Sequence, residues 1–408
     1  AVLLAVLARH ACLVPLSPRR AVADLEGVQP VVAIVKPGSD LTASIEPGGP
    51  AAPSRPGVLV LISTAGTTGT PKRVPVTYES ISASLAGTRS MAGRTGRRGL
   101  RPDVTLVPFP FVHMSEIIPL LITFLTGRRV ALMRKFDARG AAALIREHGM
   151  TSVMLNPTAL SMLLDPSIPP ADLETLRFVR SGSAPLSADL AAAFEDRFGV
   201  IVMQAYGQTE TGGEVIGWSP ADHKDFAESK RGSAGRPHPG IEARAVEAGV
   251  NPGLGALPPD AAGDLWLRGV RGRDGWHRTG DRARIDEDGF VWVEGRADDL
   301  ILCGGFNIAP LAVEDALASH PGVTEAAVVG VPDDRLGQIP VAVVVARDDR
   351  PREDALTAWC RDRLEPYQVP RAYVWVEALP RNEVGKVHRP STLALARKAE
   401  GGEEGMCR

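Results

Sequence analysis

One stretch decides the fold: Val58-Leu59-Val60-Leu61-Ile62, followed by Ser63-Thr64-Ala65-Gly66-Thr67-Thr68-Gly69-Thr70-Pro71-Lys72. The first five residues are apolar and mostly β-branched, which predicts a buried strand. The next ten bury almost nothing, and Gly66 and Gly69 allow sharp turns and close approach to a ligand. The hydroxyls and the charge of Lys72 suit an anion, above all polyphosphate. The alternative is a flexible surface turn, which the many hydroxyls and the Pro-Lys ending disfavour. The loop is not a Walker motif, because no Gly-Lys-Ser/Thr closes it.

Length and composition limit the class of protein. A chain of 408 residues is too long for one ordinary core, so two or three domains are expected. Apolar residues at 44% and charged residues at 23% fit a soluble globular protein. A net charge of -2 argues against a nucleic-acid surface or a polybasic membrane patch. The four cysteines are scattered without a C-x-x-C pair, which disfavours a zinc site or disulfides and favours a reducing, cytoplasmic location.

No apolar run reaches the ~20 residues of a membrane span. The longest candidate is 117–125. The apolar start at 1–8 could pass for part of a signal peptide, but no basic segment precedes it and Arg9-His10 ends it. We therefore expect a buried helix there.

The order of the patterns predicts an α/β fold. Up to about residue 230, strand patterns such as 31–35, 104–107, 152–155 and 177–179 alternate with helix patterns such as 138–148 and 188–198. This alternation predicts parallel sheets, with 31–35 as one of their strands and with ligands at the carboxyl ends near 63–72 and 181–186. Short alternating segments with Gly and Pro turns then predict antiparallel β structure. We expect a large N-terminal domain of parallel-rich sheets flanked by helices, with a small β-barrel-like subdomain, over residues 1–297. A small α+β C-terminal domain follows over residues 298–408.

Two further loops carry chemistry. Tyr206-Gly207-Gln208-Thr209-Glu210 follows an apolar strand, and Tyr206 offers a face on which a base can stack. Thr209 can bind a phosphate oxygen, and Glu210 can ligate Mg²⁺ beside a triphosphate. Asp281 stands on a tight turn where it could accept both ribose hydroxyls. Each loop alone has an ordinary alternative, a strand-end turn for the first and an Asp capping its own turn for the second.

The last two segments are ambiguous on their own. Gly295-Arg296-Ala297-Asp298-Asp299 is either a solvated linker or a ribose contact followed by a hinge. Lys386, in the loop that ends Gly385-Lys386, would most often be a solvated surface charge.

Together these segments resemble the adenylate-forming superfamily of acyl-CoA synthetases, carrier-protein adenylation domains and beetle luciferases. Five motifs in order carry the resemblance across nearly the whole chain: Ser63–Lys72, Tyr206–Glu210, Thr279–Asp281, Gly295–Asp298 and Gly385-Lys386. The chain looks most like an acyl- or aryl-CoA ligase. Ala65 and Arg73 depart from the family's frequent serine and glycine. The family also carries a substantial segment before the pattern of 1–18, which implies an N-terminally truncated member with part of its first subdomain missing.

The resemblance implies a role for each candidate residue. Lys386 would bridge the carboxylate and the α-phosphate, Thr209 would contact the phosphoryl group, Glu210 would ligate Mg²⁺, and His113 would stand near the acyl pocket. The nucleotide and thiol contacts would be Thr64, Gly66, Thr67, Thr68, Gly69, Lys72, Ser183, Ala184, Pro185, Tyr206, Asp281, Arg296, Gly304 and Gly305. Small residues, together with Val179, are expected to line the acyl site: Ala205, Gly207, Gly212 and Gly213. The C-terminal domain would rotate about a hinge at Asp298 between two half-reactions.

The function implied is ATP-dependent activation of a carboxylic acid to an acyl-adenylate, followed by transfer to the thiol of coenzyme A. The cofactors would be ATP, Mg²⁺ and coenzyme A, or carrier-protein phosphopantetheine. No Asp stands within 109–116 to pair with an amino-acid ammonium, so a fatty or aromatic acid is favoured. The alternatives are an acyl-AMP ligase that loads a carrier protein, and an inactive nucleotide-binding or interaction protein. The joint presence of Lys72, Glu210, Asp281 and Lys386 argues against the last.

Overall fold

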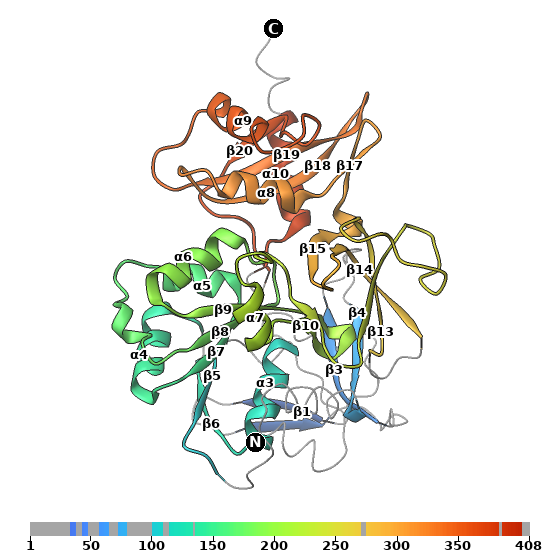
Figure 1. The fold of residues 1–408 in the computed structure, drawn as a ribbon. Helices are drawn as coiled ribbons and strands as arrows, with labels where there is room; N and C mark the ends of the chain where they lie inside the picture. The colour runs from blue at the N-terminus through green and yellow to red at the C-terminus, as the bar shows by residue number, and fades with distance from the viewer. Residues whose placement is uncertain are drawn as a thin grey trace.

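The computed structural model describes residues 33–37, 43–47, 57–64, 72–79, 100–108, 114–133, 135–270, 275–382 and 386–401. Figure 1 shows a large N-terminal domain and, above it, a small C-terminal domain. The α/β class and this two-domain division agree with the sequence-based prediction.

A five-stranded sheet forms the centre of the large domain. Its strand order is β11-β10-β9-β8-β7, with β7, β8 and β9 parallel and the other two antiparallel. The strands are β7 (Ser152–Leu155), β8 (Phe178–Ser181), β9 (Ile201–Gln208), β10 (Gly213–Gly217) and β11 (Arg236–Pro237). The short strands β5 (Val104–Val107) and β6 (Arg129–Leu132) pair in parallel beside it.

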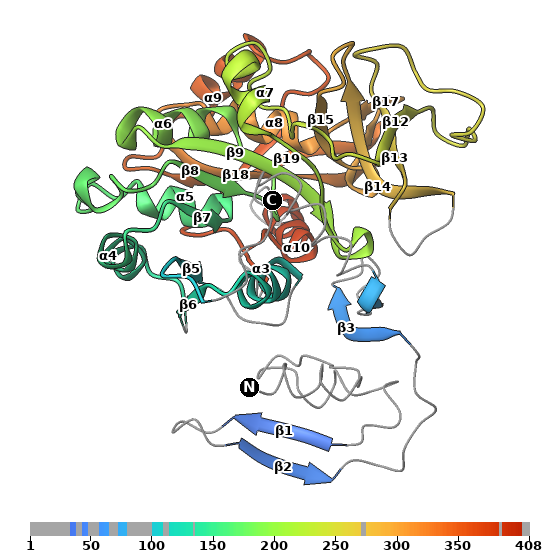
Figure 2. The same ribbon diagram turned by 60° about the horizontal axis from the view of Figure 1, so that its bottom comes forward.

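Helices cover one face of the central sheet (Figure 2). They are α4 (Ala138–His148), α5 (Pro157–Leu163), α6 (Ala188–Phe198) and the 3₁₀ turn η2 (Pro170–Asp172). Their ends follow local chemistry: Asp137 accepts from Gly140 N at the start of α4, and left-handed Gly149 ends it. Ser187 and Gly199 do the same for α6. Ile145, Leu160 and Phe194 are fully buried in the core between these helices and the sheet.

The stretch that opens the sequence analysis forms a hairpin. Strands β3 (Val58–Thr64) and β4 (Lys72–Thr77) pair antiparallel, and α3 (Met114–Leu125) packs its apolar face on them. The parallel strand predicted at 31–35 is wrong. Strand β1 (Ala33–Pro37) instead pairs antiparallel with β2 (Ala43–Pro47), in a two-stranded sheet of its own. A continuous apolar run fits either pairing direction, so the pattern did not decide.

The second half of the large domain is antiparallel, as predicted for the β-barrel-like subdomain. A sheet of order β12-β13-β14-β15 packs on the central sheet through Val215, Ile216 and Leu265. Its strands are β12 (Glu242–Val246), β13 (Gly263–Arg268), β14 (Trp276–Ile285) and β15 (Val291–Arg296). The helix α7 (Pro220–Phe226) and the 3₁₀ turn η3 (Thr209–Thr211) precede this sheet in the chain.

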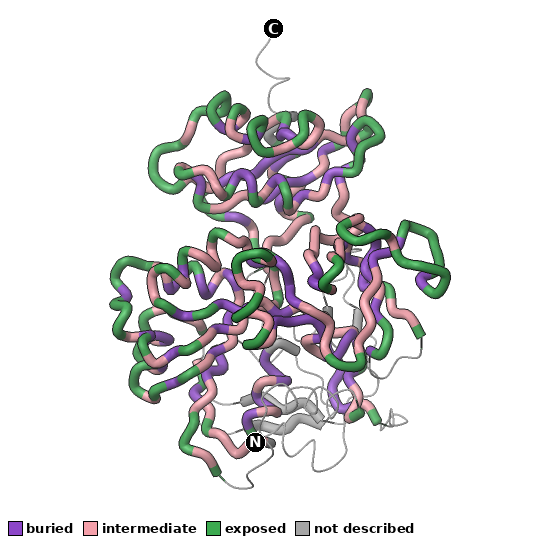
Figure 3. The backbone as a smooth tube through the Cα atoms, viewed as in Figure 1, coloured by how far each residue is buried: buried purple, intermediate pink, exposed green. Residues whose placement is uncertain are grey.

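The small domain follows the 3₁₀ turn η4 (Ala297–Asp299). Its sheet has the order β17-β16-β19-β18, with β20 parallel to β19, and its middle strands are buried (Figure 3). The strands are β16 (Ile301–Cys303), β17 (Phe306–Ile308), β18 (Val323–Asp333), β19 (Gly337–Ala346) and β20 (Ala372–Trp375). The helices are α8 (Pro310–Ala318), α9 (Glu353–Arg361) and α10 (Arg389–Gly401). Among all the described helices of both domains, none is long and apolar enough to cross a membrane.

Candidate active site

Asp281, on β14, is the centre of the candidate site. Its carboxylate is 6% exposed and joins two sheets. Oδ2 accepts hydrogen bonds from the Tyr206 hydroxyl and from Gln208 Nε2, each at 2.5 Å. Oδ1 accepts from Arg296 Nη1 at 3.2 Å. The structure therefore brings together three predicted residues, of which Tyr206 and Asp281 are 75 positions apart in the sequence.

Burial controls the charges of this cluster. Burial raises the pKa of Asp281, although the Tyr206 hydroxyl, Arg296 and Gln208 act against it. The pKa of Tyr206 is raised well above its ordinary value by burial and by the charge of Asp281. The phenol thus stays protonated and keeps donating to the carboxylate, which fixes the ring beside Asp281.

The turn before Asp281 is shaped by glycine. Gly280 has a φ of 77°, and a Cβ there would lie 2.6 Å from Arg296 Nη2. Thr279 Oγ1 donates to the carbonyl of Leu265 at 2.9 Å and accepts from the backbone N–H of Asp281 at 3.0 Å. Glycine therefore lets the arginine approach the backbone closely, beside the carboxylate that it pairs with.

The loop 206–210 turns at the carboxyl end of β9. A Cβ on Gly207 would lie 2.0 Å from the carbonyl oxygen of Gly213, so only glycine fits between β9 and β10. The turn η3 then places Thr209 and Glu210, both partly exposed, next to β4. Lys72 begins β4, so two of the predicted phosphate-binding segments lie together.

The Gly/Thr loop is closed by a strand pair. Thr64 and Lys72 are direct partners at the end of the β3–β4 ladder, and the loop runs between them. Gly66, Thr67, Thr68 and Gly69 lie outside the described residues, as does His113. Their predicted roles stay predictions.

The loop after β8 lies against β9. A Cβ on Gly182 would lie 2.9 Å from the carbonyl of Ala205, one residue before Tyr206. Ser183 has a φ of 71°, and it is followed by Ala184 and Pro185. The loop predicted as a second wall of the nucleotide site is therefore beside the tyrosine.

Lys386 comes from the small domain. Its backbone N–H donates to Asn382 Oδ1 at 3.0 Å and its carbonyl accepts from Asn382 N at 2.8 Å, in a narrow hairpin. Although the residue keeps solvent exposure, partial burial lowers the pKa of its ammonium. The charge of Asp281 and, more weakly, that of Glu210 oppose this shift, whereas Arg296 adds to it. The lysine therefore lies within electrostatic reach of both carboxylates.

Gly304 and Gly305, the two glycines predicted to lie along the thiol's path, are not beside Asp281. Gly304 and Gly305 have φ values of 58° and 88° in the turn between β16 and β17, where Gly304 N donates to the carbonyl of Leu336 at 2.8 Å. In Figure 1 this end of the small domain, marked by β17, lies away from the large domain. The structure brings Lys386 to the site and leaves these glycines outside it.

The sequence analysis gave Gln208 no role, although its side chain is part of the cluster around Asp281. Besides Asp281, its Nε2 donates to the carbonyl of Thr279 at 3.0 Å. The signal was strand alternation, because residues 206 and 208 on one strand point to the same side.

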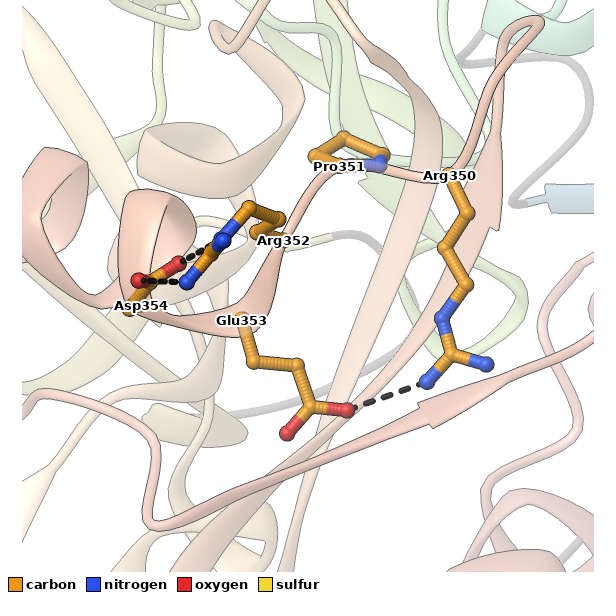
Figure 4. Close-up of a pocket in the computed structure, with 5 residues that line it drawn as sticks. All are labelled: Arg350, Pro351, Arg352, Glu353 and Asp354. Carbon is orange, nitrogen blue, oxygen red and sulfur yellow. Dashed lines mark hydrogen bonds and ion pairs between the residues drawn. The ribbon is translucent and has the colours of Figure 1, made fainter.

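A cavity of about 520 Å³ opens at the start of α9, lined by residues 350–354 (Figure 4). Its arginines are already paired, Arg350 with Glu353 and Arg352 with Asp354. None of the predicted site residues lines it, so we place no function there.

The donor set around Glu210 fits Mg²⁺ carried by a nucleotide. Within the described ranges, no group of three or more His, Cys, Asp or Glu side chains could hold a metal ion unaided. Mg²⁺ is commonly held by one or two carboxylates together with substrate phosphates. One carboxylate beside the Lys72 strand matches that arrangement.

Comparison with known proteins agrees with the geometry. The family described as AMP-binding enzyme matches residues 2–272, and its C-terminal domain matches residues 312–386. The chain is 34% identical, over 80% of its length, to the fatty acid–[acyl-carrier-protein] ligase ScoC of Streptomyces coeruleorubidus. It is also 34% identical, over 81% of its length, to the 2-succinylbenzoate–CoA ligase of Bacillus cereus (strain AH820).

One solved structure is similar as well: the O-succinylbenzoate coenzyme A synthetase of Bacillus subtilis in complex with ATP and magnesium ion. It matches with a TM-score of 0.69 and 30% identity, over 81% of this chain and 69% of that one. The chain spans 65% and 68% of the length of the two curated relatives, in line with the expectation that it is shorter than family members.

Proposed function

Because the chain belongs to the AMP-binding enzyme family, we propose that it activates a carboxylic acid with ATP and passes the acyl group to coenzyme A. One observation carries the proposal: Asp281 accepts hydrogen bonds from Tyr206, Gln208 and Arg296, and its charge acts on Lys386 of the small domain. Such an arrangement would bring the ammonium of Lys386 to the phosphates of a nucleotide bound beside Asp281.

The first half-reaction joins two anions. A carboxylate oxygen attacks the α-phosphorus of ATP. The bond between that phosphorus and the oxygen that bridges to the β-phosphate breaks, and pyrophosphate leaves. A carboxylate is already ionised at neutral pH, so this step needs no general base. Lys386 would neutralise charge that builds on the α-phosphate, and Lys72 would hold the outer phosphates.

The remaining residues would position the nucleotide. Asp281 and Arg296 would hold the ribose, Tyr206 would stack near adenine, and Thr209 would donate to a phosphoryl oxygen. Glu210 would be the protein ligand of Mg²⁺, which when bound neutralises phosphate charge. These roles follow from the resemblance, and the contacts of Tyr206 and Arg296 with Asp281 support those of these three residues.

In the second half-reaction the thiol sulfur attacks the acyl carbonyl and AMP leaves. We propose that the small domain, residues 298–408, rotates about Asp298 so that Gly304 and Gly305 replace Lys386 at the site. The turn η4 lies between the two domains, which supports a hinge there. We also propose a cytoplasmic location, on the cysteine pattern.

A second candidate is an acyl-AMP ligase whose acceptor is the phosphopantetheine thiol of a carrier protein. The relative named as a fatty acid–[acyl-carrier-protein] ligase favours it, and the first half-reaction is identical.

The test is ATP–pyrophosphate exchange over a panel of carboxylic acids, followed by thioester detection with coenzyme A and with a carrier protein. Exchange that depends on the acid supports the proposal, and the acceptor assay separates the two candidates. Absence of exchange with every acid would support an inactive nucleotide-binding protein instead.

A further inference from the structure

Arg381 lies at the base of the hairpin that carries Lys386. Its backbone forms an antiparallel bridge with Val387, and the next residue inward, Asn382, bonds to Lys386 through both backbone and side chain. Val387 packs on the core of the small domain, against the cluster that contains Val329 and Val341. Arg381 and Lys386 are therefore one step apart on the same hairpin, so a displacement of the arginine would displace the lysine as well.

The guanidinium of Arg381 has a partner in each domain. Nη2 pairs with Glu325 Oε1 on β18 of the small domain. Nη1 donates to Thr158 Oγ1 on α5 of the large domain at 3.5 Å. The first contact moves with the small domain. The second exists only while the small domain stands beside α5.

Thr158 lies at the edge of the central sheet where ligands of parallel sheets bind. Strands β7, β8 and β9 are parallel, so α5, α6 and the turn η3 all follow strands at the same edge. The small domain lies above α5 and α6 there (Figure 1). Residues inside the strands can be covered instead: Val179 of β8 is fully buried in the core with α4, α5 and α6, so the expectation that it lines the acyl site is wrong.

Two other places show how the domains meet. Beside the proposed hinge, a Cβ on Gly295 would lie 3.8 Å from Leu311 Cβ of α8, an ordinary apolar contact. At the start of α6, Asp189 lies within electrostatic reach of Asp315 on α8. Partial burial raises the pKa of Asp315 to about 6, and the charge of Asp189 adds to the shift. Two carboxylates repel each other, so this part of the interface favours separation, whereas Arg381 provides attraction at the same edge.

We propose that Arg381 is a positioning residue: its hydrogen bond to Thr158 latches the lysine hairpin onto the large domain for the first half-reaction and breaks before the second. The inference rests on the proposed function, because it assigns a residue to one of the two domain orientations. Rotation about Asp298 must carry Arg381 away from α5. Glu325 rotates with it, so the guanidinium keeps an anionic partner in both orientations, and only a neutral hydroxyl is exchanged for water. A long bond to a neutral acceptor is weak enough to break in every turnover.

Two substitutions of Thr158 should act in opposite directions. Thr158→Val keeps the shape and removes the acceptor, so exchange should fall about fivefold, while thioester formation from supplied acyl-adenylate and coenzyme A stays unchanged or rises. Thr158→Asp offers Arg381 a charged acceptor, so exchange should be kept while thioester formation falls about fivefold or more. A carboxylate near the start of α5 also suits the helix dipole, so the fold should tolerate it. The acid is the one that gives the fastest exchange in the panel described above.

Two controls separate the latch from general effects. Thr175→Val removes a shorter hydrogen bond, 2.9 Å to the carbonyl of Met150, entirely within the large domain. It should lower stability and leave the ratio of the two half-reactions unchanged. In an Arg381→Met background, neither change at Thr158 should alter that ratio any further, because the donor is gone.

The orientation of the domains can be measured without catalysis. Nitroxide labels are placed at Glu147→Cys on α4 and Asp362→Cys after α9, both exposed, in a chain whose Cys12 and Cys407 are replaced by Ser. The remaining cysteines, Cys303 and Cys360, are buried. Distances are recorded with an ATP analogue whose α,β-bridge is a methylene group. Compared with the unchanged chain, Thr158→Val should add or enlarge a second distance population, and Thr158→Asp should diminish it.

The outcomes separate this inference from the proposed function. Exchange in the unchanged chain, with both Thr158 variants behaving like Thr175→Val, overturns the latch and leaves the proposed function standing. Distances that shift as expected, without exchange on any acid, overturn the proposed function and support the latch. Equal losses of both half-reactions in Thr158→Val, or identical distances in all the variants, overturn the latch.

Discussion

Ser183 carries a strained backbone in the loop that we propose as one wall of the nucleotide site. Its φ of 71° lies in the left-handed region, which costs an L-residue roughly 1–2 kcal/mol. Ser183→Gly should therefore leave the free energy of unfolding unchanged or raise it by up to about 1 kcal/mol, because glycine's extra chain entropy offsets part of the gain. Chemical denaturation measures this.

Asp260 provides the matched control. It has a φ of 62° and lies outside the candidate site, and its carboxylate pairs with Arg284 Nη1 at 2.7 Å on the surface. Asp260→Gly should therefore have a similar or somewhat less favourable effect on stability, because an exposed ion pair contributes little, and none on exchange. If Ser183→Gly lowers stability instead, the hydroxyl makes a contact that outweighs the backbone strain.

Lys386 predicts an alkaline limit to the first half-reaction. Its ammonium must be protonated to neutralise the α-phosphate, and burial lowers its pKa from the ordinary 10.5. The charged form is lost as pH rises through this lowered pKa, so kcat/KM for exchange should fall with a midpoint below 10.5. The pH profile of exchange, with Lys386→Arg as the variant that stays charged, measures it. A midpoint at or above 10.5 in the wild type would refute the assignment.

At the scale of elements, Arg389 joins the loop of Lys386 to the rest of the small domain. It stands at the start of α10, and its guanidinium donates to Glu314 of α8 and, at 2.8 Å, to the carbonyl of Val328 in β18. Nε lies 3.8 Å from Asp299 of η4, beside the proposed hinge. One side chain thus fixes the lysine hairpin to the helix, the sheet and the hinge segment.

Arg389→Lys keeps the charge but loses the forked contact, so Lys386 should be misplaced. We expect exchange to fall by on the order of 10²-fold, as for a small displacement of a reacting group. Because Arg389 acts through Lys386, the same variant should still convert supplied acyl-adenylate and coenzyme A to thioester. Arg350→Ala, which breaks an exposed ion pair of the same domain, is the control. Equal losses of exchange and of thioester formation would show a merely structural role.

Sequence patterns predicted the elements better than their pairing. The strand-to-loop transitions were predictable to within about three residues, because apolar runs that end in Gly and hydroxyl residues have few other interpretations. The sequence placed the loop starts at Ser63 and Tyr206, whereas β3 continues to Thr64 and β9 to Gln208. The antiparallel pairing of β3 with β4 was not, since an apolar run fits either direction. The contact of Tyr206 with Asp281 was not either: it joins residues 75 apart, and only tertiary packing of two sheets creates it.

At the scale of the whole molecule, we propose that one small domain serves two half-reactions through different loops. Lys386→Ala should abolish acyl-adenylate formation yet still convert supplied acyl-adenylate and coenzyme A to thioester. Gly305→Leu should do the reverse, because the side chain obstructs the thiol loop. Each half-reaction is assayed separately for each variant.

A strain-matched control is Gly289→Leu. Gly289 has a φ of 82° and open space around it, as Gly305 does with its φ of 88°, but it lies on the β14–β15 turn. Its effect should be confined to stability. If Lys386→Ala and Gly305→Leu impair both halves equally, a single fixed closed state is the better account.

The positions of Lys386 and of the two glycines also predict how the rate of thioester formation depends on solvent viscosity. Since the lysine is at the site while the β16–β17 turn is not, complete turnover requires a whole domain to move through water, whereas exchange alone does not. Added sucrose should then slow thioester formation in proportion to the viscosity and leave pyrophosphate exchange nearly unchanged. Thioester formation that does not slow with viscosity would mean that the rotation is not what limits turnover. The enzyme would in that case be governed by its chemistry, and its speed would be indifferent to how crowded its surroundings are.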